Sequence, residues 1–94
     1  MNKYETVIII SDKVDDSKRI EVLERVKKYI EENGTLTKVD DIGLKKLAYQ
    51  IQKCSNGYYY YIYFDAKSDK IAGLERLYRI TDEIIKFITI RNDS

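Results

Sequence analysis

The sequence contains no histidine and no proline, and Cys54 is its only cysteine. Without histidine, the Ser-His-Asp and Cys-His types of catalysis, histidine metal sites and a histidine pH switch are all excluded. One cysteine excludes an internal disulfide and a metal site built from several cysteines. Because proline is absent, every break in secondary structure has to come from glycine, asparagine, aspartate or serine.

A strong net charge and long apolar runs are also missing. The 17 Lys and Arg residues nearly balance the 16 Asp and Glu residues, so the net charge of +1 gives no overall attraction to nucleic acid or membranes. No apolar stretch approaches the roughly 18–20 residues of a membrane span, and the N-terminus has no signal-peptide cleavage pattern. We therefore expect a cytoplasmic protein in a reducing compartment.

The 94 residues suffice for one hydrophobic core, so a single domain covering residues 1–94 is expected. Hydrophobic patterning predicts strands at residues 4–10, 35–52, 58–66 and 84–91, with a bulge at Gly43 and a turn at residues 54–57 that ends in Asn-Gly. One helix is predicted over residues 18–33, and a second begins at Ser68 or Asp69 and is broken at residues 81–83. Residues 92–94 are expected to be a frayed end.

Local signals add detail to the first helix. Asp15, Asp16 and Ser17 are candidate N-caps, and Asn33-Gly34 predicts a left-handed stop. The apolar residues that recur on one helical face, and are expected to face the core, are Ile20, Leu23, Val26 and Ile30. In the second helix the corresponding face is formed by Ile71, Leu74, Leu77 and Tyr78.

The order β-α-β-β-α-β predicts an α+β, ferredoxin-like fold: a four-stranded antiparallel sheet with both helices on one face. Alternation along the third strand then assigns its two faces. Asp65 should not enter a core, so Tyr58, Tyr60, Ile62 and Phe64 are expected to pack on the helices. That leaves Tyr59, Tyr61 and Tyr63 on the face that no helix covers.

Residues 43–64 form a local basic and aromatic zone. They contain Lys45, Lys46 and Lys53, no acidic residue, and six of the nine tyrosines. An exposed row of Tyr59, Tyr61 and Tyr63, joined by Tyr49 if the register of its strand allows, is typical of a contact site for bases or for a protein partner. Strand propensity alone also produces such rows, and a lysine pair in a strand also serves to discourage edge-to-edge aggregation.

No site for catalysis is recognised. The acidic pairs, which are Asp15-Asp16, Asp40-Asp41 and Asp82-Glu83, are explained by helix capping and turns. The four glycines are isolated, so there is no glycine-rich phosphate loop. We predict no catalytic residue, metal, cofactor or small-molecule substrate.

Several segments together resemble one known family. Residues 43–51 read Gly-Leu-Lys-Lys-Leu-Ala-Tyr-Gln-Ile, which resembles the signature Gly-Leu-basic-basic-Leu-Ala-Tyr-Pro-Ile of the sixth protein of the bacterial small ribosomal subunit. Gln50 stands where that signature has proline. The opening Tyr4-Glu5, the aromatic strand from Asn56, and residues 79–86 are similar to that family too.

The resemblance implies a non-enzymatic ribosomal protein that binds the central domain of small-subunit ribosomal RNA. It also implies a partner, the eighteenth small-subunit protein, with which this family acts as a heterodimer. We expect the tyrosine row, with Tyr49, to dock the protein partner because Asp65 lies in line with it. Phosphate contacts are predicted for the basic residues Lys3, Lys45, Lys46, Arg79, Lys86 and Arg91.

Two other functions share this topology. One is an RNA-recognition-motif-like domain that binds single-stranded RNA on its sheet, which residues 56–63 loosely resemble. The other is a small-molecule-binding regulatory domain, or an acylphosphatase-like enzyme, although residues 11–13 do not look like a phosphate-cradling loop. A regulatory domain should be an obligate oligomer, whereas the ribosomal interpretation predicts a monomer until its partner binds.

Overall fold

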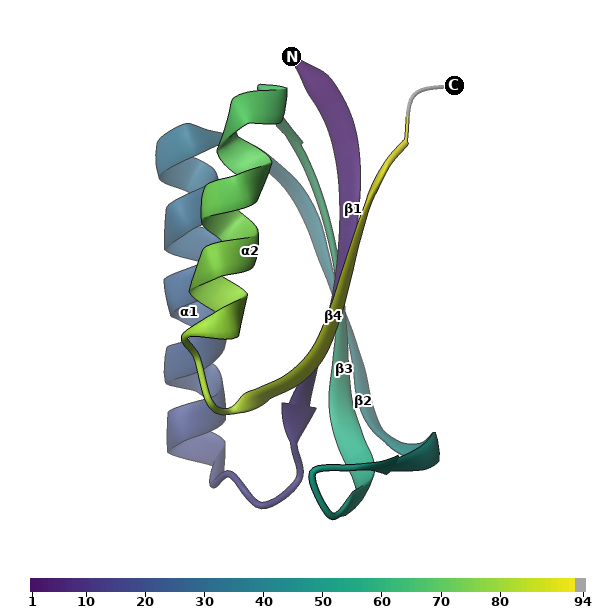
Figure 1. Ribbon diagram of the computed structural model, residues 1–94. Coiled ribbons are helices and arrows are strands. Elements are labelled where there is room, and N and C mark those ends of the chain that lie inside the picture. The colour runs from purple at the N-terminus through teal and green to yellow at the C-terminus, as the bar shows by residue number, and fades with distance from the viewer. Residues whose placement is uncertain (93–94) are drawn as a thin grey trace.

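The fold was analysed in a computed structural model that describes residues 1–92, so the expectation for residues 93 and 94 lies outside it. The elements are β1 (Asn2–Ser11), α1 (Asp16–Asn33), β2 (Gly34–Ile51), β3 (Cys54–Ala66), a 3₁₀ turn η1 (Ser68–Lys70), α2 (Ile71–Arg79) and β4 (Ile84–Arg91). The strands form one antiparallel sheet in the order β2-β3-β1-β4. Both helices cover the same face of it (Figure 1). The predicted ferredoxin-like fold is confirmed.

Strand β1 lies in the middle of the sheet. It pairs with β3 along its whole length and with β4 from Tyr4 to Ile10. Ile8 and Ile10 are fully buried beneath the helices, and Ile9, which points to the opposite face, is only 6% exposed. The continuous apolar run of this strand therefore reflects burial on both faces, as predicted.

The main core lies between the helices and the sheet. Its largest fully buried side chains include Tyr60 and Ile62 from β3 and Tyr78 from α2. The predicted faces of β3 and of the second helix are confirmed, since Leu74 and Tyr78 are buried and Ile71 and Leu77 pack against them. Within residues 1–92, neither helix is both long and apolar enough to cross a bilayer.

The predicted face of α1 is wrong at its first position. Asp15 caps the helix by accepting a hydrogen bond from the Lys18 amide at 2.8 Å, but Ile20 is 55% exposed. The side chain that faces the sheet in the first turn is Arg19, which donates a hydrogen bond of 2.7 Å to the Tyr60 hydroxyl. The buried stripe is therefore Val22, Val26 and Ile30 at a spacing of four residues.

The expected left-handed stop after α1 is also absent. Gly34 is extended (φ −177°) and already belongs to β2. A side chain there would collide with the Asp65 carbonyl oxygen. Glycine is therefore needed at this position for the close approach of β2 to β3, and not for backbone handedness. At the start of the second helix, neither Ser68 nor Asp69 makes a capping bond, and the chain enters α2 through the 3₁₀ turn.

The turn between β2 and β3 lies earlier than predicted. Gln52 and Lys53 have positive φ angles of 50° and 65° and join the paired residues Ile51 and Cys54. Asn56 and Gly57 belong to β3 instead, and a Cβ on Gly57 would collide with the Ile9 side chain. The predicted bulge at Gly43 is confirmed by a φ of +90° and a register shift.

The end of the β2–β3 hairpin, residues 47–54, folds over the sheet face opposite the helices, and we call it the hairpin tip. Residues 47–50 of β2 lie opposite the single residue Ser55, so the hairpin bends there. Figure 1 shows the tip turning away from the helices. Leu47 and Cys54 of the tip pack with Ile9 and Ile85 into a second, smaller core. Cys54 is thus buried, where a polar turn was expected.

A buried hydroxyl network links β1, β4 and α2. The Thr6 hydroxyl, which is fully buried, lies 3.1 Å from the Tyr78 hydroxyl and 2.9 Å from the Thr89 hydroxyl, and also contacts the Ile88 carbonyl. Tyr78 is 1% exposed, and burial raises the pKa of its phenol well above the ordinary value. Its hydroxyl therefore depends on Thr6 for a hydrogen-bond partner in the described residues.

We expect Thr6→Val to lower the free energy of unfolding by about 1–3 kcal/mol, because it leaves the buried Tyr78 hydroxyl unsatisfied. Tyr78→Phe should cost about 1 kcal/mol or less, since Thr6 keeps its bonds to Thr89 and Ile88. Urea unfolding of both variants measures the difference. An equal or larger loss for Tyr78→Phe would contradict this assignment.

The turn gives a second prediction. Replacing Gln52 by Asn and Lys53 by Gly should raise the free energy of unfolding by about 0.5–1 kcal/mol, because asparagine and glycine adopt the positive φ angles of these two turn positions with less strain. Ser55→Gly is the control in the neighbouring extended strand, where glycine should lower stability by about 0.5–1 kcal/mol. Thermal unfolding of the three proteins decides the point, and a double variant no more stable than the natural chain would contradict it.

Candidate functional site

The sheet face that no helix covers, here called the open face, is built by simple alternation along three strands. β3 contributes Tyr59, Tyr61 and Tyr63, all partly exposed, so the predicted placement of this row is confirmed. The register sets Val7 of β1 between Tyr61 and Ile88 of β4. The open face is therefore a continuous surface over β3, β1 and β4.

The hairpin tip covers one end of the open face and is held there by a polar contact. Tyr49 of the tip accepts a hydrogen bond of 3.1 Å from the Lys86 ammonium group of β4, which lies 5.3 Å from the centre of its ring. Tyr49 thus reaches the open face as predicted, and it stays 62% exposed. Lys86, which was predicted to contact phosphate, is engaged in this contact.

Beyond the tip lies an apolar strip made of Val7, Tyr59, Tyr61, Ile88 and Ile90. Ile88 and Ile90 are 53% and 50% exposed, which is high for isoleucine in a strand. A shallow hollow of about 280 Å³ lies between Val7, the two tyrosines and Ile88. These two isoleucines were not predicted from the sequence, where Thr89 between them was the one polar signal of alternation.

The far end of the open face is charged. This charged end comprises Lys3, Glu5, Lys38, Tyr63 and Asp65, and Asp40 of β2, which pairs with Tyr61, lies at its border with the apolar strip. Lys38 lies 3.4 Å from Asp40 and 6.0 Å from the centre of the Tyr63 ring. A hydrogen bond to the Glu5 carboxylate raises the pKa of the Tyr63 phenol, with smaller contributions from burial and from the charges of Glu5 and Asp40. Tyr63 therefore differs in its surroundings from the two tyrosines of the apolar strip.

The six residues predicted to bind phosphate do not form one patch. Lys45 and Lys46 are exposed on β2, an edge strand, just after the Gly43 bulge. Arg79 lies in the helical layer, 3.9 Å from Glu75. Lys3 and Arg91 share the end where β1 begins and β4 ends, and Arg91 donates a hydrogen bond of 2.8 Å to the Asn2 side chain. The cations thus lie in separate places around the molecule.

Arg19 is a partly buried cation that was not predicted from the sequence. Its guanidinium bonds to Asp16 at 2.8 Å and to the Tyr60 hydroxyl, and it lies 4.1 Å from the centre of the Tyr58 ring. The hydrogen bonds to Asp16 and Tyr60 raise its pKa further above the ordinary value. These contacts make Arg19 part of the fold. Among residues 1–92, no group of three acidic or cysteine side chains is arranged to hold a metal ion.

Comparison with known proteins identifies the family. The sequence profile described as Ribosomal protein S6 matches residues 3–91. The chain belongs to the ribosomal protein S6 family. It is 42% identical to the small ribosomal subunit protein bS6 of Caldanaerobacter subterraneus subsp. tengcongensis, over 99% of each chain. It is 40% identical to the bS6 protein of Nitratiruptor sp., over all of this chain and 74% of that one.

A solved structure of the same family agrees with the fold. The crystal structure of 30S ribosomal protein S6 from Thermotoga maritima superposes with a TM-score of 0.93 at 41% identity, covering 97% of this chain and 87% of that one. Members of the S6 family are non-enzymatic proteins of the small ribosomal subunit in the cytoplasm, and as one of them this chain associates with ribosomal RNA.

The family signature, residues 43–51, has a clear structural role in this chain. Gly43 supplies the bulge, Leu47 is buried in the second core, and Tyr49 contacts Lys86. Gln50, in the place of proline, donates a hydrogen bond of 3.3 Å to Ser55 across the hairpin. Lys45 and Lys46 are exposed, as are the apolar signature residues Leu44 and Ala48.

Proposed function

We propose that this chain binds the central domain of small-subunit ribosomal RNA together with the eighteenth small-subunit protein, with which it forms a heterodimer. The observation that carries the proposal is the apolar strip on the open face. Exposed isoleucines at two successive outward positions of β4, next to tyrosines of β3, form a contiguous apolar surface, and such surfaces mark contact sites.

The chemistry of the strip suits a protein better than nucleic acid. A surface that stacks bases needs positive charge among its rings to hold the phosphates between them. Lys86 is the cation that borders the strip on β4, and its ammonium group is bonded to Tyr49. Tyrosine and isoleucine, by contrast, bury large apolar area, and the tyrosines keep a hydroxyl group for a polar rim.

In this proposal few phosphates are contacted directly by this chain. Its net charge is +1, and its exposed cations are dispersed. Affinity for RNA grows with the number of neutralised phosphates, so most of the electrostatic attraction comes from the partner. Lys45 and Lys46, both exposed on an edge strand, are the strongest candidates for direct phosphate contacts in this chain.

We expect Tyr61→Ala and Ile88→Ala each to weaken binding to the eighteenth protein by about 1–2 kcal/mol, because both side chains would be buried at the interface. Ile20→Ala is the matched control, since Ile20 is exposed to a similar extent but lies on α1. Titration calorimetry of the purified proteins gives the affinities. Undiminished partner binding with lost RNA binding would instead support a domain resembling the RNA-recognition motif.

The RNA contact is tested separately. Lys45→Ala combined with Lys46→Ala should weaken binding of the heterodimer to central-domain RNA and reduce the slope of log affinity against log salt by about one unit per lysine. The control is the adjacent pair Lys27 and Lys28 on α1, replaced in the same way. An unchanged affinity and salt dependence would show that Lys45 and Lys46 make no phosphate contact.

A further inference from the structure

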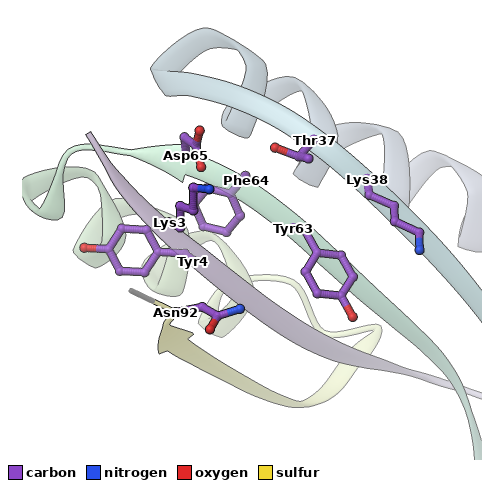
Figure 2. Close-up of a pocket in the computed structure, with 8 residues that line it drawn as sticks. All are labelled: Lys3, Tyr4, Thr37, Lys38, Tyr63, Phe64, Asp65 and Asn92. Carbon is purple, nitrogen blue, oxygen red and sulfur yellow. The ribbon is translucent and has the colours of Figure 1, made fainter. Parts of the chain in front are cut away.

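A hollow at the charged end has a lining that matches a nucleotide. It measures about 370 Å³ and lies beside Lys3, Thr37, Lys38, Tyr63, Asp65 and Asn92, with the core residues Tyr4 and Phe64 also contributing (Figure 2). Its size falls within the usual range for small-ligand sites, which is about 300–1,000 Å³. Its lining combines an aromatic ring, two ammonium groups, one carboxylate and two neutral polar side chains.

We propose that this hollow holds one unpaired guanine nucleotide of RNA. The proposal rests on the proposed function and deepens it, because it gives this chain a base-reading site in addition to its phosphate contacts. It also separates Tyr63 from Tyr59 and Tyr61: the first contacts RNA, and the other two contact the protein partner.

Asp65 selects the base. Its carboxylate lies on the open face, partly exposed, and can accept two hydrogen bonds side by side. Guanine presents two adjacent donors, N1–H and N2–H, on its Watson–Crick edge. Adenine, cytosine and uracil each place an acceptor beside their donor, and that acceptor would face the negative carboxylate. Only guanine therefore satisfies both carboxylate oxygens without repulsion.

Tyr63 supplies the stacking surface. Its strand position places it opposite Glu5 of β1, and the Lys38 ammonium group lies 6.0 Å from the ring centre. Unpaired bases in RNA commonly stack on such rings.

Lys3 provides the main charge for the phosphates, because the Lys38 ammonium group already lies 3.4 Å from the Asp40 carboxylate. The two lysines lie on different strands, β1 and β2, so they border the hollow from two sides, as Figure 2 shows. Asn92 is held at the rim because its backbone N–H donates a hydrogen bond of 2.7 Å to the Lys3 carbonyl. Its side-chain amide can donate to a phosphate or a ribose oxygen.

The mixed charge of the lining favours a nucleotide over the other ligands that could enter. A phosphate alone would meet the Asp65 carboxylate, and a basic protein side chain would meet Lys3 and Lys38. A nucleotide separates the two kinds of chemistry, since its base edge is neutral and rich in donors while its phosphate is negative. This match of charges carries the choice of ligand.

The test uses the full chain and fluorescein-labelled hexauridylate in which one central uridine is replaced by guanosine or by adenosine, with binding followed by anisotropy. We expect the guanosine probe to bind about tenfold more tightly than the adenosine probe, as for a two-bond contact to a base edge. Asp65→Asn should abolish most of this preference, and Lys3→Ala should weaken both probes by the same factor.

Matched variants test the stacking ring. Tyr63→Leu should weaken both probes about tenfold, as expected for the loss of a stacking ring, while Tyr61→Leu, two residues away on the same strand and face, should leave them unchanged. Far-ultraviolet circular dichroism confirms that each variant is folded. Equal affinity of the natural chain for the two probes, or equal losses for the two tyrosine variants, would overturn the proposal.

The probes need no partner, so they test the pocket independently of the proposed function. If the natural heterodimer binds central-domain RNA but the chain does not distinguish the probes, the pocket assignment fails and the proposed function stands. If the heterodimer does not form or does not bind the RNA, the proposed function fails, and a guanosine preference that depends on Asp65 still establishes the pocket. If Asp65→Asn weakens only partner binding, the occupant is the protein and the pocket proposal is wrong.

Discussion

The contact between Ile9 and Gly57 decides how the open face is shaped. Ile9 occupies the space that a side chain at position 57 would need, so glycine at this position lets Ile9 pack across β3. Leu47 and Cys54 then close over Ile9 and Ile85. Burying these apolar side chains holds the hairpin tip against the sheet, at about 25 cal/mol per Å² of apolar area removed from water. What stays exposed of the open face is the part that the tip does not reach.

That remaining surface has two kinds of chemistry along the same strands. Near the tip, Val7, Tyr61 and Ile88 are apolar neighbours across β3, β1 and β4. Farther along, Glu5 and Tyr63 begin a region in which acidic and basic groups alternate. Because alternate side chains of a strand lie in a row on one face of the sheet, one strand can contribute to an apolar interface at one end and to a charged, hydrated one at the other. A small protein with a nearly neutral charge can therefore present two distinct contact surfaces on one face.

Periodicity was sufficient to predict the order of elements and the faces of β3. The period-2 alternation from Tyr58 to Asp65 needs only local information, and the charged Asp65 indicated which of the two faces is not buried under the helices. The turn was misplaced because Asn56-Gly57 has the composition of a turn, while the requirement for glycine at 57 comes from Ile9, distant in sequence. Ile20 was assigned to the core for a similar reason, since only the tertiary structure shows that Arg19 reaches Tyr60.

The candidate site was predictable to a similar extent. The tyrosine row was found because strand propensity and alternation coincide in β3. Ile88 and Ile90 were not found, because β4 also carries Ile84, Ile85 and Phe87 and so reads as apolar on both faces. The phosphate-binding residues were predicted from residue type alone, and in the fold they lie apart from one another. Two of them already have partners, because Lys86 is bonded to Tyr49 and Arg91 to Asn2. A sequence shows neither the positions nor these partners.

The central place of β1 has a consequence for how the chain is made. β1 is synthesised before both of its neighbours in the sheet, β3 and β4, and β4 follows all the other described elements. Tyr4 pairs with Arg91, so one edge of β1 stays unpaired until β4 has been synthesised. An apolar strand with an open edge is prone to pair with other chains. During synthesis this protein therefore depends on rapid pairing of β4 with β1, and a truncated chain lacking β4 would be the form most exposed to aggregation.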